Sequence, residues 1–469
     1  MRKALFLLCF LLSACLAWLS CGNGSAAPPS HTSGIAYRAF LTNNVSSGTS
    51  SAGVYIVNAA TDIRPSVSPI SAGNNPNMML VTPNRAQTLV FSGNGLPSSD
   101  NQFTIIGNSA EAASGHVNLP GMTYSFVVSP DSSTAYIAVP TGPGEPGQSP
   151  GLLEAVQLSS ASVVGTVNVP ALRYLSIDNS GDRILGFSDG ASSVADSVAV
   201  ITPSNIGIGN AVTFIGGPGI FDHPVAAFFT ADDSTAYVLN CGPECGGTQA
   251  SVQAIDMTTN PPTPGAAAPV PAATVALVTN SSMLYLAGTP YSGGAPSQPC
   301  TGQTTAATTC GLLTIFNLNS MTVVNTSPIV ITDGYHDHIV FGANGQLFIG
   351  AHACTEILPP PPPATGETRG CLSIYNTLTT AVGSAPAGGV LIPSANGDVT
   401  GIQPITTRGA SMAQEVVYVI QGQGVPQGGS LSIYDVTKDA LEYNPNNYLN
   451  PGQIRGLVGN FYDVKTVDF

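Results

Sequence analysis

The stretch "DGYHDHIVFGANGQLFIGAH", residues 333–352, concentrates the side chains best suited to chemistry. It holds three of the six histidines in the chain, together with two aspartates. A carboxylate beside an imidazole orients the ring and raises its basicity, which suits a general base or a metal ligand. We weigh these two interpretations against a third, a polar pair that caps a strand while the other histidines lie in solvent. The sequence by itself favours the third.

The strand pattern decides which of these side chains can meet. The Asn-Gly dipeptide at residues 344–345 predicts a hairpin turn between two apolar strands. Counting outward from this turn places Asp337 opposite His352. His336 and His338 then point to the other side of the strand, because side chains alternate along a strand. Asp337 and His352 are therefore the candidate catalytic pair.

A wider set of residues is the candidate for a ligand or metal site. His223, in "GIFDHPVAAFF", is expected at the same end of the fold. The candidates are His223, His336, His338, His352 and Asp337. The chain has no HExxH metal motif, no GxSxG nucleophile motif and no phosphate-binding glycine loop. We predict no specific cofactor, and a divalent metal remains open.

Hairpin segments with a similar sequence pattern recur along the chain. Segments such as "VVSPDSSTAYIAV" (127–139) and "FFTADDSTAYVLN" (228–240) place a polar turn between two short apolar strands. A third alternating strand follows, such as "LLEAVQL" from residue 152, and then a weaker fourth. Four short antiparallel strands per unit predict the blade of a β-propeller.

The repeats predict an all-β fold, a single β-propeller over residues 34–469. Its second strands fall near residues 36, 88, 135, 183, 236, 284, 347 and 416. Eight blades follow by count, and a seven-blade ring with one irregular unit is the alternative. The C-terminal "DVKTVDF" (463–469) is expected to complete the first blade and close the ring.

The segments "SPDSSTAYIAV" and "SIYDVT" resemble the YVTN-type and lactonase-like propellers of bacterial surface and periplasmic proteins. The resemblance covers most of residues 34–469. It implies the propeller fold and says little about activity. The segment "HIVFGANGQLFIGAH" also looks like the strands of quinone-dependent sugar dehydrogenases, which carry tryptophan in each blade. That function is disfavoured because the only tryptophan, Trp18, lies in the leader.

Six cysteines fall in three local pairs, each within one loop between a second and a third strand. Such loops lie on the same face as the connections between blades, so all three are expected on one face. Loop closure is cheapest between neighbours, which predicts disulfides in an oxidising compartment. The predicted pairs are Cys241 with Cys245, Cys300 with Cys310, and Cys354 with Cys371.

The N-terminus, "MRKALFLLCFLLSACLAWLSCGNGSAAPPS", predicts an export signal over residues 1–20. It resembles a bacterial lipoprotein leader, in which small residues precede a lipidated cysteine. We favour Cys21 over Cys15, because residues 21–33 then form a flexible tether. A secreted protein without lipid is the alternative. The expected location is the cell envelope, with the lipid anchored in the outer membrane on its periplasmic or surface side.

The low content of charged residues and the negative net charge disfavour some classes of partner. Charged residues are only 8% of the chain and the formal net charge is −14, which disfavours nucleic acid and anionic membranes as partners. We expect a monomer that touches the membrane only through its lipid. Its function is predicted to be non-catalytic binding of a ligand or protein through the disulfide-stapled loops. The alternative is a lactonase-like hydrolase with a metal or acid and base site at the channel mouth.

Overall fold

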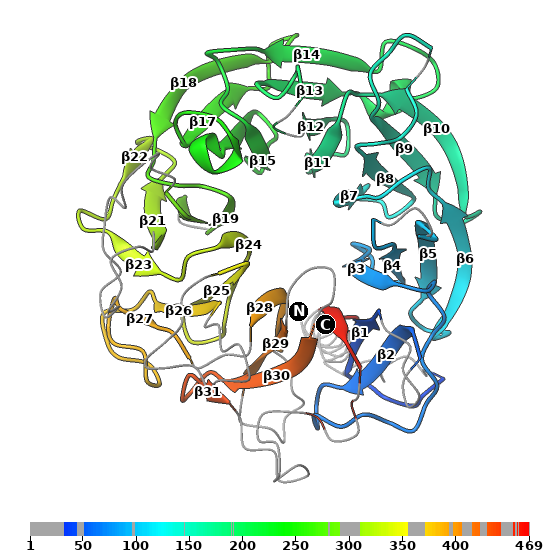
Figure 1. Ribbon diagram of the computed structural model, residues 1–469, viewed down its shortest axis with the longest axis vertical. Helices are drawn as coiled ribbons and strands as arrows, with labels where there is room; N and C mark the ends of the chain where they lie inside the picture. The colour runs from blue at the N-terminus through cyan, green and yellow to red at the C-terminus, as the bar shows by residue number, and fades with distance from the viewer. Residues whose placement is uncertain are drawn as a thin grey trace, which may run out of the picture.

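The chain folds into β-sheets that are arranged as a ring around a central axis (Figure 1). The computed structural model describes residues 32–44, 51–95, 99–144, 146–188, 190, 192–279, 282–290, 310–354, 371–393, 397–405, 415–422, 429–441, 454, 457 and 459–468. The predicted leader, most of the tether, and Cys15, Cys21 and Cys300 lie outside these residues. No helix in the described part of the chain is long and apolar enough to cross a membrane.

Seven units, numbered two to eight along the chain, have four antiparallel strand positions each. The innermost strands are β3 (Pro76–Val81), β7 (Ser125–Val128), β11 (Leu172–Ile177), β15 (Pro224–Phe229), β19 (Val275–Val278), β24 (Tyr335–Phe341) and β28 (Asp398–Ile405). The second strands are β4 (Gln87–Ser92), β8 (Thr134–Val139), β12 (Ile184–Ser188), β16 (Thr235–Asn240), β20 (Met283–Gly288), β25 (Gln346–His352) and β29 (Val416–Gly422).

The outer half of each unit completes the sheet. The third strands are β5 (Gln102–Gly107), β9 (Leu152–Gln157), β13 (Ser197–Ile201), β17 (Ser251–Asp256), β21 (Gly311–Asn317), β26 (Leu372–Asn376) and β30 (Gly429–Asp435). The outermost strands are β6 (Ala112–Asn118), β10 (Ser162–Asn168), β14 (Val212–Gly216), β18 (Thr263–Pro269), β22 (Thr322–Val323) with β23 (Ile329–Ile331), β27 (Val390–Leu391) and β31 (Ala440–Leu441). Two short 3₁₀ helices, η1 (Pro203–Asn205) and η2 (Gly242–Cys245), lie in loops.

The first unit joins the two ends of the chain. It contains β32 (Phe461–Thr466), β1 (Arg38–Asn43) and β2 (Gly53–Asn58), in that order outward. β1 and β32 pair antiparallel, with Leu41 opposite Val464. The all-β propeller is thereby confirmed, with seven four-stranded units, an additional unit and closure by the C-terminal strand.

The core lies between neighbouring units, which pack face to face. In β4, Leu89 and Phe91 pack with Phe126 of the third unit, whereas Val90 packs with Phe40 and other apolar residues of the first. Both faces of a middle strand are therefore buried. This packing explains why these strands are apolar at consecutive positions rather than at alternate ones.

Candidate functional site at the mouth of the central channel

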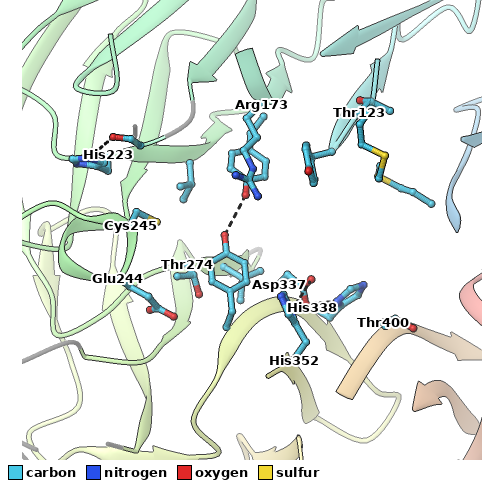
Figure 2. Close-up of a pocket in the computed structure, with 18 of the residues that line it drawn as sticks. Thr123, Arg173, His223, Glu244, Cys245, Thr274, Asp337, His338, His352 and Thr400 are labelled. Atoms are coloured by element: carbon cyan, nitrogen blue, oxygen red, sulfur yellow. Dashed lines mark hydrogen bonds and ion pairs between the residues drawn. The ribbon is translucent and has the colours of Figure 1, made fainter. Parts of the chain in front are cut away.

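A cavity of about 800 Å³ opens at one end of the channel (Figure 2). Its walls come from β3, β11, β15, β19, β24, β28 and β32, and from the segment that precedes β7. Each blade of a propeller points its innermost strand at the axis, so residues far apart in sequence meet here. The volume falls within the range of about 300–1,000 Å³ that is typical of small-molecule sites.

An arginine and three tyrosines form one wall of the cavity. The Arg173 guanidinium lies 4.4 Å from the ring centroid of Tyr124 and 5.4 Å from that of Tyr174. The hydroxyls of Tyr174 and Tyr335 are 3.4 Å apart (Figure 2). Burial raises the pKa of Tyr335, so its phenol stays neutral. The sequence analysis did not single out these residues, because no motif marks them.

Beside Tyr335, Asp337 lies close to two imidazoles. Its Oδ1 lies 2.6 Å from Nδ1 of His338, and its Oδ2 lies 3.5 Å from Nδ1 of His352. Burial opposes charge on His338, but the Asp337 carboxylate outweighs it and raises the pKa of this imidazole. The ring of His352 also packs on Tyr335, with 5.1 Å between the ring centroids. The structure thus brings together Asp337, His338 and His352, all of which line the cavity.

The predicted register of this hairpin is wrong. Tyr335, not Asp337, lies opposite His352, and His338 lies opposite Gly350. One cause is a longer turn, in which the Gly342 amide donates to the Gln346 carbonyl. The other is a β-bulge at residue 337, which lets His338 and Asp337 face each other instead of alternating.

His336 does not reach the cavity. It is fully buried, and Thr274 donates a hydrogen bond to its backbone carbonyl at 2.8 Å. Burial lowers the pKa of its imidazole to about 4, so the ring is neutral at physiological pH. Of the five candidate residues, the structure therefore places four at the cavity, and His336 belongs to the packing behind it.

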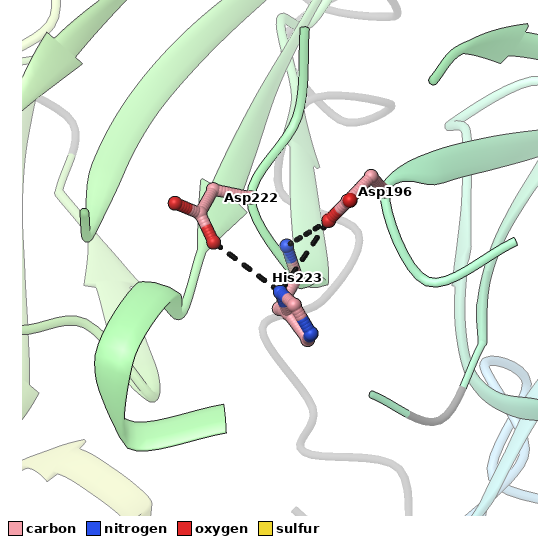
Figure 3. Close-up of side chains that lie close together, drawn as sticks. All are labelled: Asp196, Asp222 and His223. Carbon is pink, nitrogen blue, oxygen red and sulfur yellow. Dashed lines mark hydrogen bonds and ion pairs between the residues drawn. The ribbon is translucent and has the colours of Figure 1, made fainter. Parts of the chain in front are cut away.

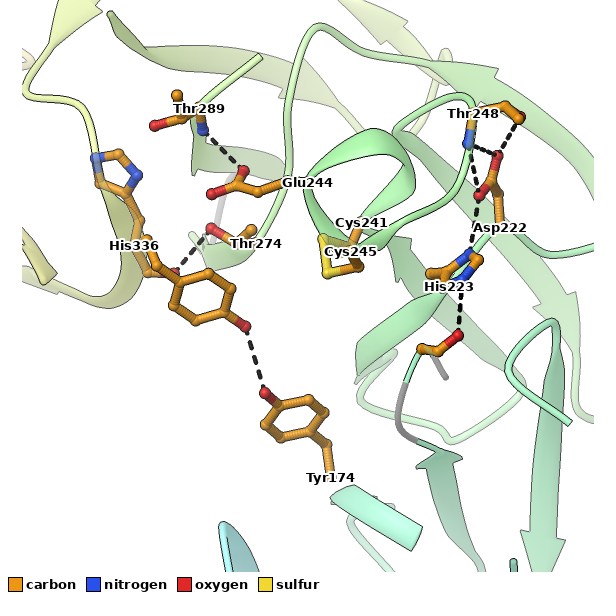
Figure 4. Close-up of a disulfide and its surroundings, with 12 residues drawn as sticks. Tyr174, Asp222, His223, Cys241, Glu244, Cys245, Thr248, Thr274, Thr289 and His336 are labelled. Atoms are coloured by element: carbon orange, nitrogen blue, oxygen red, sulfur yellow. Dashed lines mark hydrogen bonds and ion pairs between the residues drawn. A yellow bond between two sulfur atoms is a disulfide. The ribbon is translucent and has the colours of Figure 1, made fainter. Parts of the chain in front are cut away.

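Glu244 is a cavity residue that the sequence analysis missed. It lies in η2 between Cys241 and Cys245, whose disulfide holds this turn beside the cavity (Figure 4). Burial raises the pKa of its carboxyl to about 7, although the Thr289 amide donates a hydrogen bond to it at 2.8 Å. A carboxyl with this pKa can release or accept a proton near neutral pH. The available sequence signal is the glutamate between the two cysteines of a predicted disulfide, in "CGPEC".

The described disulfides match the predicted local pairs. Cys241 bonds Cys245 and Cys354 bonds Cys371, with Cα atoms 5.7 and 5.8 Å apart. Cys310 is also disulfide-bonded, and its predicted partner Cys300 lies outside the described residues. Both described pairs lie between the second and third strands of their units, so they emerge at the end of the ring that carries the cavity.

His223 borders the same cavity from the start of β15. Its Nδ1 lies 3.2 Å from Oδ1 of Asp222 and 3.4 Å from Oδ1 of Asp196 (Figure 3). Hydrogen bonds from Thr248 and Gln249 to Asp222 outweigh its burial and lower the pKa of this carboxyl. His223 is thus the one candidate histidine with two carboxylates beside a single ring nitrogen.

No protein-family model matches the chain, and no curated protein matches it in sequence. Solved structures do resemble it. The dihydro-heme d1 dehydrogenase NirN, solved in complex with DHE, is 11% identical with a TM-score of 0.54, over 94% of this chain and 76% of that one. The periplasmic gluconolactonase PpgL of Pseudomonas aeruginosa is 12% identical with a TM-score of 0.42, over 92% and 98% of the two chains. Hydrazine synthase of Kuenenia stuttgartiensis is 12% identical with a TM-score of 0.46, over 61% and 76%.

The similarity to NirN supports the fold alone, because the two chains share only 11% of their sequence. The resemblance to propellers is supported at this level. The narrower relation to YVTN-type and lactonase-like proteins stays a prediction.

Proposed function

We propose that the protein binds a small, neutral, polyhydroxylated molecule, such as a monosaccharide or its lactone, at the channel mouth. The observation that carries this proposal is the cavity of about 800 Å³ and its lining. The proposal keeps the predicted face and the predicted binding role. It moves the binding surface from the disulfide-stapled loops to the cavity beneath them.

The chemistry of the walls favours a neutral ligand. Tyr124, although large, is 46% exposed, so part of its ring is free to pack on the apolar face of a sugar. Tyr335, Thr274 and the imidazole of His352 offer groups that donate or accept hydrogen bonds with hydroxyls. The positive charge of Arg173 lies across the cavity from the negative charge of Asp337 (Figure 2). Of the other lining carboxyls, Asp463 is paired with Lys465 at 2.8 Å, and burial raises the pKa of Glu244 to about 7.

The test is a panel of neutral monosaccharides, their lactones and the corresponding sugar acids, screened by thermal shift and then by titration calorimetry. We expect neutral members to bind and Arg173→Ala to weaken the binding at least tenfold. Arg64→Ala is the matched control, since Arg64 lies 4.6 Å from the Tyr55 ring in a similar stack outside the cavity. Failure of the whole panel to bind, or equal binding by both variants, would contradict the proposal.

Hydrolysis of such a lactone is the second candidate function. The observation that favours it is Glu244, with a pKa of about 7, in one cavity with an Asp337 carboxylate that orients two imidazoles. If the protein is a hydrolase, Glu244→Gln will lose turnover of a lactone while still binding it. If wild-type protein binds lactones and leaves them intact over hours, the binding function stands and the hydrolase does not.

We also propose that the protein is exported and lipid-anchored at Cys21, as its leader suggests. Mass spectrometry of the mature N-terminus in a bacterial host is expected to find a lipid on Cys21. Cys21→Ser is then expected to release the protein from the membrane fraction, and Cys15→Ser is not. Release by Cys15→Ser alone would assign the anchor to Cys15, and an unlipidated N-terminus would make the protein a soluble exported one.

A further inference from the structure

We propose that Asp196, Asp222 and His223 form a binding site for a divalent transition metal, with Zn²⁺ as the best fit. Asp196 immediately precedes β13 of the fourth unit, and the other two residues immediately precede β15 of the fifth. Within the described residues, this is the only group of three potential metal ligands whose ligand atoms all lie within 4.8 Å of one another (Figure 3). Two carboxylates and one imidazole are a ligand set that Zn²⁺ accepts.

The distances from His223 Nδ1 to the two carboxylates are longer than those of a strong charge-assisted hydrogen bond. This nitrogen lies 3.2 and 3.4 Å from the two carboxylate oxygens. A charge-assisted hydrogen bond is about 2.7–2.9 Å long, and the bond between His338 and Asp337 is 2.6 Å. Two ligands of a tetrahedral Zn²⁺, each about 2.1 Å from the metal, lie about 3.4 Å apart. Both carboxylate oxygens therefore lie at the distance from Nδ1 that is expected between ligands of one ion, and all three atoms lie within 4.8 Å of one another.

The second ring nitrogen of His223 points to the same conclusion. Nε2 lies 3.2 Å from the Gly190 carbonyl oxygen. A carbonyl only accepts hydrogen bonds, so Nε2 carries a proton, and Nδ1 is the ring nitrogen that lies beside the two carboxylates. A metal ion bound there would take Nδ1 as a ligand in place of its proton, while Nε2 keeps its bond to the carbonyl. Donation of the other N–H to a backbone carbonyl is the usual arrangement of a metal-bound histidine.

The surroundings hold the proposed ligands in place. Oδ2 of Asp222 accepts hydrogen bonds from the Thr248 hydroxyl at 2.6 Å and from the amides of Thr248 and Gln249 at 2.9 and 2.8 Å (Figure 4). The other oxygen, Oδ1, is thereby directed to His223. A Cβ on Gly247 would lie 1.7 Å from Asp222 Oδ1 and 2.7 Å from His223 Nδ1, so only glycine fits beside the pair.

The site borders the cavity through His223. Three protein ligands leave a fourth tetrahedral position open, which water or a hydroxyl of a bound molecule can fill. The two carboxylates balance the charge of the ion. The inference does not require that the cavity binds a sugar, because the metal site is complete in protein ligands by itself.

Zinc titration of the chelator-treated protein, purified without a histidine tag, tests the inference. We expect one Zn²⁺ per chain by calorimetry and elemental analysis, and visible absorption of a tetrahedral centre when Co²⁺ replaces it. His223→Ala and Asp196→Asn are expected to weaken zinc binding at least tenfold. His116→Ala, on the exposed outer strand β6, removes a histidine elsewhere and is expected to change nothing.

Circular dichroism of the metal-free variants separates a lost ligand from a lost fold, and His223→Gln gives a second, milder variant. Absence of zinc binding in the wild-type protein would overturn the inference. So would equal affinity in the folded His223 variants, or loss of zinc in His338→Ala instead. No organic ligand enters this experiment, so its failure is distinct from a failure of the proposed binding function.

Discussion

At the scale of single residues, the channel mouth combines ionisable groups with opposite behaviour. The carboxyl of Glu244 has a raised pKa because burial disfavours its charge. The Asp337 carboxyl is also partly removed from water, but two neighbouring imidazoles outweigh this and lower its pKa. One carboxyl is therefore protonated well above the pH at which the other ionises. Such divergence is typical of functional sites, although structural pairs also produce it.

Glu244→Gln is predicted to stabilise the protein increasingly as the pH rises. The pKa of Glu244 is raised from 4.5 in the unfolded chain to about 7 in the fold. The unfolded chain therefore loses this proton first, so the glutamate makes the native state progressively less stable as the pH rises from 4.5 to about 7, and this loss of stability remains at higher pH. Above pH 7 the variant should unfold with a free energy about 3 kcal/mol higher than wild type. Urea denaturation at pH 4.5 and pH 8 measures this, and an equal difference at both pH values would contradict it.

Asp337→Asn is predicted to lower the pKa of His338. The carboxylate is what raises this pKa, and burial acts in the other direction. Without the charge, burial prevails and the imidazole should titrate below its ordinary value of 6.5. Nuclear magnetic resonance of the histidine side chains follows the titration directly. An unchanged His338 pKa in the variant would show that Asp337 does not control it.

At the scale of elements, local sequence signals predicted the hairpins but not their register. The Asn-Gly pair at residues 344–345 does lie in the turn between β24 and β25, and Gly345 adopts a left-handed φ of 78°. The longer turn and the bulge at Asp337 shift the pairing, and neither has a sequence signature. Both depend on how β24 packs on its neighbours. The pair of Asp337 with His352 was therefore predicted for the wrong geometric reason.

A second limit of prediction from the sequence concerns which side chains meet at the cavity, as with Glu244, Arg173 and Tyr335. Each lies on a different unit, and only the closure of the ring brings them to one cavity. Periodicity within a unit predicts that the first strand faces the axis. It does not predict which side chains reach across the channel, because that depends on the tilt and spacing of all the units.

The longer of the two described disulfides is predicted to contribute more stability. Cys354 and Cys371 are 17 residues apart, whereas Cys241 and Cys245 are 4 apart. By restricting the unfolded chain, the Cys354–Cys371 disulfide should contribute about 3 kcal/mol to the free energy of unfolding, and the Cys241–Cys245 disulfide about 2 kcal/mol. Guanidinium denaturation of the two double Cys→Ala variants measures both losses. A larger loss for the short pair would mean that native contacts of η2, rather than loop closure, dominate.

At the scale of the whole molecule, a buried ion-pair network near the two ends of the described chain holds the ring closed. Arg38 is 1% exposed and donates to Asp468 through Nε at 2.9 Å and Nη2 at 2.5 Å. Its Nη1 lies 2.9 Å from Glu111, at the turn between β5 and β6 of the second unit. Ser33 also donates its amide and hydroxyl to Glu111. The first unit, the second unit and the C-terminus are thus tied through one buried cation.

Arg38→Met is predicted to destabilise the ring by about 3–5 kcal/mol, because it removes the cation that two sequestered carboxylates contact. Lys438→Met is the control, since its ammonium pairs with Asp435 at 3.1 Å but its side chain is 65% exposed. The control should lose less than about 1 kcal/mol. Thermal and chemical unfolding of both variants provide the comparison. Similar losses would mean that the buried network does not hold the ring closed.

The central claim is that the mouth of the channel, rather than the stapled loops around it, is the binding surface. A crystal structure of the protein with the tightest-binding neutral compound of the sugar and lactone panel tests this most directly. We expect the compound inside the cavity, packed on Tyr124 and within hydrogen-bond distance of Tyr335 or His352. A compound bound instead on the outer strands or on the loops, with the cavity filled only by water, would contradict it.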